Sequence, residues 1–90
     1  MNPMNEHPGC LLFPCTFPIK VMGHNTKAFS SAVEEIFSRH LNPGEYTSTS
    51  RPSSGNKYLS ITVTFTAQSK AQLNAIYEEL NRNKLVVMTL

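Results

Sequence analysis

The chain has 90 residues, of which 40% are apolar and 16% are charged. Because a second core would not fit in so short a chain, we expect one domain. Eight Lys and Arg against six Asp and Glu leave a net charge of +2, too weak a bias to indicate nucleic acid or an anionic membrane as partner. No apolar stretch approaches a membrane span, and the first residues carry no secretory pattern. We therefore expect a cytoplasmic protein.

The two cysteines, Cys10 and Cys15, lie in the stretch CLLFPC. A redox motif would need two residues between them, and a metal site would need a second cysteine pair or closely spaced histidines. His7, His24 and His40 do not supply that spacing. We expect reduced structural thiols, no metal and no cofactor.

The first half of the chain predicts an arm, a strand and a helix. Residues 1–13 contain Pro, Gly and Asn without periodicity, which predicts a flexible N-terminal arm before a single domain at 14–90. Apolar residues then alternate from position 17, which predicts a half-buried strand ending at Gly23. From Asn25 or Thr26, either of which suits an N-cap, apolar spacing becomes helical and continues to an Asn-Pro-Gly stop at 42–44.

The second half predicts a hairpin, a helix and a last strand. Residues 46–51 are rich in Ser and Thr and indicate a strand, and Gly55-Asn56 suits a turn that needs positive φ. The stretch YLSITVTFTA alternates without a break, the clearest strand pattern in the chain. Ser69 and Gln72 match a capping box, in which Gln72 would reach back to the Ser69 amide. LVVMTL predicts a terminal strand.

The order strand, helix, strand, strand, helix, strand predicts an α+β fold, the ferredoxin-like βαββαβ sandwich. With right-handed crossovers the four strands form an antiparallel sheet of order 4-1-3-2, and both helices cover one face.

Several motifs together resemble the YbeD-like family of small bacterial proteins. They are FPCTFPIKVMG, the run from Arg39-His40 through Pro43-Gly44 to Tyr46, RPSSGNKYLSITVTF, and QLNAIYEEL followed by VVMTL. The resemblance covers about residues 13–90. It implies a fold similar to the ACT-type regulatory domains, which are ferredoxin-like and bind small effectors, often amino acids, between paired copies. It implies no catalytic or binding residue.

Two loops are candidate ligand sites. In the hairpin, Arg51, Ser53, Ser54 and Lys57 could donate to an anion, although small hydroxyl residues beside Gly-Asn are also what an exposed turn prefers.

The second loop joins the first strand to the first helix, where free amides could meet the carboxylate of a small effector. Its candidate residues are Met22, Gly23, His24, Asn25 and Thr26. A capped helix after a glycine turn is the alternative interpretation.

The terminal strand is apolar on both faces, which is unusual beside a solvent-facing sheet surface. The residues expected to face the helices are Val86, Met88 and Leu90. The residues expected to face outward, as an interface, are Met22, Leu85 and Val87. A contiguous apolar strip at a sheet edge is more often covered by a partner than left open.

Other chemistry has weaker support. The open sheet face lacks the stacking aromatics of RNA readers, with Tyr58 alone at its edge. His40 and Arg39 suit a helix C-terminus, and Glu34-Glu35 and Glu78-Glu79 suit solvated helix positions. We therefore expect a non-enzymatic regulatory or interaction module that acts by protein-protein contact, including self-association. An ACT-like effector-binding domain is the alternative, and a small hydrolase is the third hypothesis.

Overall fold

The computed structural model describes residues 12–90. Its elements are β1 (Cys15–His24), α1 (Lys27–His40), β2 (Tyr46–Pro52), the single 3₁₀ turn η1 (Ser54–Asn56), β3 (Tyr58–Ala67), α2 (Lys70–Arg82) and β4 (Val86–Thr89). The predicted order of strands and helices is confirmed. The predicted arm, residues 1–13, lies almost wholly outside the described residues.

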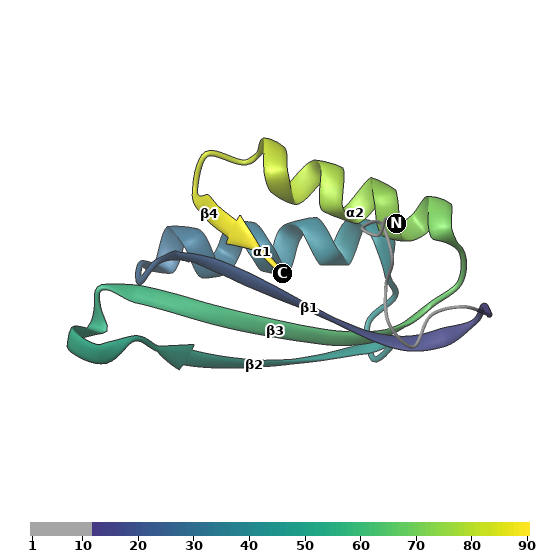
Figure 1. The fold of residues 1–90 in the computed structure, drawn as a ribbon, viewed down its shortest axis with the longest axis horizontal. Coiled ribbons are helices and arrows are strands. Elements are labelled where there is room, and N and C mark those ends of the chain that lie inside the picture. Colours follow the sequence, from purple (N-terminus) through teal and green to yellow (C-terminus); the bar gives the residue numbers. More distant parts are fainter. Residues whose placement is uncertain (1–11) are drawn as a thin grey trace.

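The four strands form one antiparallel sheet in the order β2-β3-β1-β4, which is the predicted order read from the other edge. Both helices lie on the same side of the sheet, and the other side is uncovered (Figure 1). This confirms the ferredoxin-like α+β fold. The uncovered side is called the open face below.

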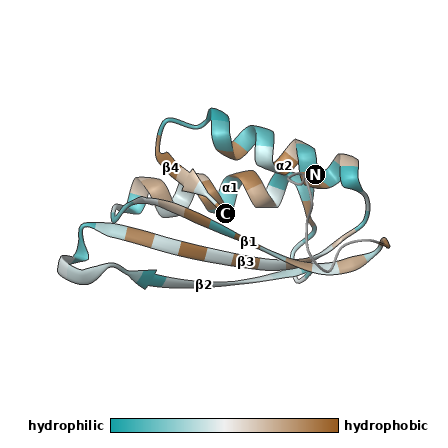
Figure 2. Cartoon of the chain, viewed as in Figure 1, coloured by the Kyte–Doolittle hydropathy of each residue, from teal (hydrophilic) through white to brown (hydrophobic). Residues whose placement is uncertain are grey.

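The core lies between the sheet and the two helices, as the alternation in β3 predicts. Side chains at alternate positions of β3 are buried, and the strand shows bands of alternating hydropathy (Figure 2). The buried residues of β3 are Leu59, Ile61, Val63, Phe65 and Ala67. Those of the helices include Phe29, Val33, Ile36, Phe37, Leu73, Ile76 and Leu80.

Both helices begin at predicted caps. Thr26 Oγ1 accepts a hydrogen bond from the Phe29 amide at 3.1 Å, and Ser69 Oγ accepts one from the Gln72 amide at 3.1 Å. The predicted return bond is different, because Gln72 Oε1 accepts from the Gln68 amide at 2.8 Å instead of the Ser69 amide. The glutamine therefore closes the turn that enters the helix, one residue earlier than expected.

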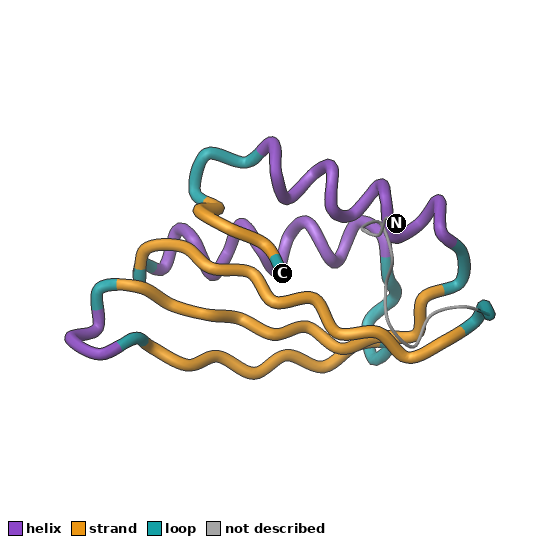
Figure 3. The backbone as a smooth tube through the Cα atoms, viewed as in Figure 1, coloured by secondary structure: helices purple, strands orange, loops and turns teal. Residues whose placement is uncertain are grey.

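The β2–β3 hairpin ends in a short helical turn (Figure 3). Gly55 has φ of 83° and Asn56 has φ of 59°, which confirms the predicted need for positive φ at this pair. The turn is longer than a two-residue hairpin loop, because η1 lies between the strands.

β4 pairs with β1 through a bulge that the sequence did not reveal. Met22 pairs with Met88 and Gly23 with Val86, so Val87 is one extra residue on the β4 side. Because paired residues share a face, Met88 lies on the open face beside Met22.

The prediction that Met88 and Leu90 face the helices is therefore wrong. Met88 is 48% exposed and Leu90 is 64% exposed. Leu90 and Lys20 also exchange two backbone hydrogen bonds, at 2.8 and 3.2 Å, which places Leu90 on the open face. The bulge breaks the simple alternation on which the prediction depended.

One further expectation is corrected. Cys15, the first residue of β1, is disulfide-bonded, so the prediction of reduced thiols is wrong for Cys15 in this structure. Cys10 lies outside the described residues. Neither α1 nor α2 has the length and apolar character that a membrane crossing requires.

A candidate docking surface on the open sheet face

An exposed apolar strip follows β4 and the residue before it. Leu85 is 40% exposed and Val87 is 56% exposed, while Met22 is partly buried. These are the three predicted interface residues, and the bulge adds Met88 and Leu90 to them. We call these five residues the apolar strip.

Next to the apolar strip, two hollows on the open face adjoin each other. Both are lined by Lys20, Arg51 and Ser60. The first, of about 330 Å³, is otherwise lined by hydroxyl groups, including those of Thr49 and Thr62. The second is about 250 Å³. It is otherwise lined by Met22, Pro52, Ser53, Tyr58 and Leu90. Lys20 and Arg51 thus lie between a polar hollow and a largely apolar one.

No side-chain carboxylate in the described part of the chain lies on a sheet strand. The five glutamates of residues 12–90 are Glu34, Glu35, Glu45, Glu78 and Glu79. Four are on the helices and Glu45 is in the loop before β2. The ion pairs of this part of the chain are all made by helix residues. Lys20 and Arg51 are both exposed and belong to none of them. The open face is therefore positive.

The predicted anion site at the hairpin tip is only partly assembled. Ser53 closes the turn: its Oγ accepts from the Tyr58 amide at 3.0 Å, and its carbonyl accepts from the Asn56 amide at 2.8 Å. Lys57 Nζ lies 5.5 Å from the centre of the Tyr58 ring. Arg51 and Ser53 line one hollow together, whereas Lys57 and Ser54 do not line it.

The predicted effector loop, 22–26, lies against that tip. Asn25 Nδ2 donates to the Asn56 carbonyl at 3.3 Å, and the Asn25 amide donates to the Lys57 carbonyl at 3.0 Å. The His24 and Tyr58 rings are 5.0 Å apart. The two loops that the sequence suggested separately are therefore neighbours.

Within this loop, two candidate residues have a structural role. Gly23 is buried inside β1 and does not form a turn after it. A Cβ at Gly23 would lie 2.5 Å from the Leu85 carbonyl oxygen and from the Phe29 ring, so only glycine fits without a shift. Thr26 caps α1 with its hydroxyl.

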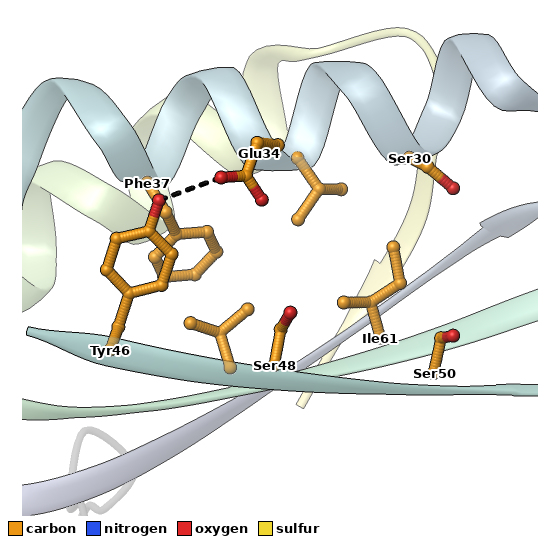
Figure 4. A pocket seen from close by; sticks show the side chains of 9 residues that line it. Ser30, Glu34, Phe37, Tyr46, Ser48, Ser50 and Ile61 are labelled. Atoms are coloured by element: carbon orange, nitrogen blue, oxygen red, sulfur yellow. Dashed lines mark hydrogen bonds between the residues drawn. The ribbon is translucent and has the colours of Figure 1, made fainter. Parts of the chain in front are cut away.

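A third hollow, of about 170 Å³, lies between α1 and β2 on the helix side (Figure 4). Val33, Phe37, Ile61 and Val63 supply its apolar lining, and Ser30, Glu34, Tyr46, Ser48 and Ser50 its polar lining. Tyr46 Oη donates to Glu34 Oε2 at 3.0 Å, and burial, followed by this bond, raises the pKa of Tyr46. Sequence reasoning missed this hollow. Its signal was the pair of small serines at alternate positions of β2.

Comparison with known proteins gives the family. The family described as "Protein of unknown function (DUF493)" matches residues 9–90. The chain belongs to the DUF493 family. A UPF0250 protein of Shewanella sediminis is 46% identical over 68 residues, covering 76% of both chains. A UPF0250 protein of Yersinia pestis is 44% identical over 80 residues, covering 89% of this chain and 91% of that one. The resemblance to the YbeD-like family is confirmed.

The solution structure of protein HP0495 from H. pylori has the same fold as this DUF493 protein. Its TM-score is 0.75 at 21% identity, covering 100% of this chain and 96% of the other. At that identity the likeness is evidence for the fold alone. The relatives are proteins of unknown function, so no activity comes with the family.

One charged cluster of the DUF493 chain differs from expectation. Glu79, predicted to be solvated, accepts from Arg39 at 2.6 and 2.9 Å and lies 2.7 Å from His40 Nε2. The hydrogen bond with His40, followed by that from Arg39, lowers the pKa of Glu79. The cluster joins α1 to α2. Among residues 12–90, no group of His, Cys, Asp or Glu has a metal-binding arrangement.

Proposed function

We propose that this DUF493 protein is a non-enzymatic regulatory or interaction module that acts by protein-protein contact through its open face. The observation that supports this proposal is the apolar strip, which follows the edge strand β4, is exposed at every member except the partly buried Met22, and reaches the open face at Met22, Met88 and Leu90. Contiguous apolar surface at a sheet edge favours covering by another chain. Burying it contributes roughly 25 cal/mol per Å² before the costs of association.

Site-specific photo-cross-linking tests the proposal in living bacteria. A photoreactive amino acid at Leu90 samples the apolar strip, and the same group at Ala71, an exposed position of α2, is the matched control. We expect a discrete adduct from position 90 and none from position 71. Val87→Lys places a charge within the strip and should abolish the adduct. Equal adducts from both positions, or none from position 90, would refute the proposal.

Self-association is one form of this function, and its test is independent of any partner. Light scattering over a range of concentrations gives the mass of the wild type and of Val87→Lys. A concentration-dependent doubling that the lysine removes would identify a second copy as the occupant of the strip.

Effector binding is a second candidate function, favoured by the contact between the 22–26 loop and the hairpin tip. A thermal-shift screen with amino acids and phosphometabolites tests it, because a ligand at 100 times its dissociation constant adds about 2.7 kcal/mol of stability. A flat screen would remove this candidate. The hydrolase hypothesis is third, since His24 packs on Tyr58 while His40 binds Glu79 in a separate cluster.

A cytoplasmic location is part of the proposal, and the redox state of Cys15 in cells tests it. In a reducing compartment the disulfide of Cys15 should be reduced. We expect a maleimide reagent to modify Cys15 in intact cells, and protection that only a reductant removes would contradict the location.

A further inference from the structure

We infer that the occupant of the open face is an acidic segment of another protein that carries apolar anchor side chains, and not a second copy of this chain. This inference rests on the proposed function and names the chemistry of the partner.

The first argument is the distribution of charge. Lys20, Arg51 and Lys57 are exposed on the sheet and hairpin, and the described side-chain carboxylates all lie on the helices or in the loop before β2. Neither Lys20 nor Arg51 has an ion-pair partner among residues 12–90. Two such faces packed together would oppose like charges, which disfavours a symmetric dimer. An acidic partner would satisfy both cations.

The second argument is the position of these cations between two kinds of surface. Lys20 and Arg51 border both hollows, and the second hollow is closed by apolar side chains, among them Met22 and Leu90. A carboxylate over the two cations would therefore place a neighbouring apolar side chain in the second hollow. The flanking apolar strip extends this contact toward β4.

Other negatively charged partners fit less well. Surfaces that bind anionic membranes by charge usually gather about four to eight cations, whereas the lysines and arginines of the described strands and hairpin are Lys20, Arg51 and Lys57. Single-stranded nucleic acid needs aromatic rings free for base stacking. The Tyr58 ring already packs against His24 and under Lys57.

The test selects peptides from a random 16-residue library displayed against the immobilised full chain, with elution by free protein. We expect the enriched peptides to have a net negative charge with at least two large apolar residues. Their dissociation constants should rise about tenfold or more between 50 and 500 mM NaCl. Lys20→Ala with Arg51→Ala should weaken binding at least tenfold. The control, Lys70→Ala with Arg82→Ala, removes the same charge from α2 and should change binding less than twofold.

The outcomes separate the two proposals. If the enriched peptides are neutral or basic but bind the Val87→Lys variant more weakly than the wild type, the acidic partner is refuted. The docking surface is then still supported. Peptides weakened equally by both double variants would also overturn it, because only overall charge would then matter. Tighter binding to vesicles containing 30% phosphatidylserine, or to a 20-nucleotide RNA, would overturn it in favour of those partners. If no enriched peptide responds to Val87→Lys, the docking surface itself fails.

Discussion

Gly23→Ala tests how closely β1, β4 and α1 pack, because it adds one methyl group where they meet. The added methyl would lie 2.5 Å from the Leu85 carbonyl oxygen and from two carbons of the Phe29 ring. The oxygen belongs to the backbone and Phe29 is fully buried, so neither neighbour can swing into solvent. Overpacking of this kind costs roughly 1–3 kcal/mol, and two obstructed directions put Gly23→Ala near the upper end, at about 2–3 kcal/mol.

The matched control is Gly44→Ala. Gly44 has φ of 87°, and a Cβ there would meet nothing within 4 Å. Its cost is therefore backbone strain alone, about 1–2 kcal/mol. Urea unfolding followed by far-ultraviolet circular dichroism gives both free energies, and thermal unfolding should show a drop of roughly 10–20 °C for Gly23→Ala. If Gly23→Ala costs less than Gly44→Ala, the described contact of Leu85 and Phe29 with Gly23 is not present.

Three further predictions concern the helices. Glu79→Gln should cost about 0.5–1 kcal/mol at pH 7, because its contacts with Arg39 and His40 are partly exposed to solvent. Since folding lowers the pKa of Glu79 from 4.5, its stabilising effect is present above about pH 4.5 and is lost as the pH falls through the lowered value. Urea titrations at pH 7 and pH 3 should therefore show the difference between wild type and Glu79→Gln shrinking in acid, and a constant difference would contradict it. Thr26→Ala should cost about 1 kcal/mol through loss of the cap, while Thr26→Ser should retain most of the stability; equal losses would show that the hydroxyl is not the cap. Ser69→Ala should behave similarly at α2, and unchanged unfolding would exclude its bond to the Gln72 amide.

The parts of the fold that sequence predicts are those that depend on local rules. β3 is buried at every second residue because its own apolar and hydroxyl residues alternate. Thr26 and Ser69 are caps because each has a short hydroxyl side chain just before a helical apolar stripe. The positive φ of Gly55 and Asn56 follows from the same kind of local preference.

The parts that sequence missed depend on partners distant in the chain. Glu79 looked solvated because Arg39 and His40 are 40 and 39 residues away. The α1–β2 hollow arises because Ser48 and Ser50 leave space beside α1 that larger side chains would fill. The small serines at alternate positions of β2 are a local sign of the hollow, but it forms only where α1 packs beside them. Nothing local to α2 records the partners of Glu79.

The bulge at Val87, opposite the step from Met22 to Gly23, connects the stability of the fold to the candidate docking surface. Gly23 allows the Leu85 carbonyl and the Phe29 ring to approach β1 closely, which fixes where β4 enters the sheet. One residue later the register shifts, and Met88 pairs with Met22 on the open face. In an unbroken alternation from Val86, Met88 would instead face the helices, so the same irregularity both anchors β4 and exposes its apolar side chains. Because burial in the monomer would favour Met88 on the helix side, its exposure on a short edge strand is the feature on which the proposed docking to another chain depends.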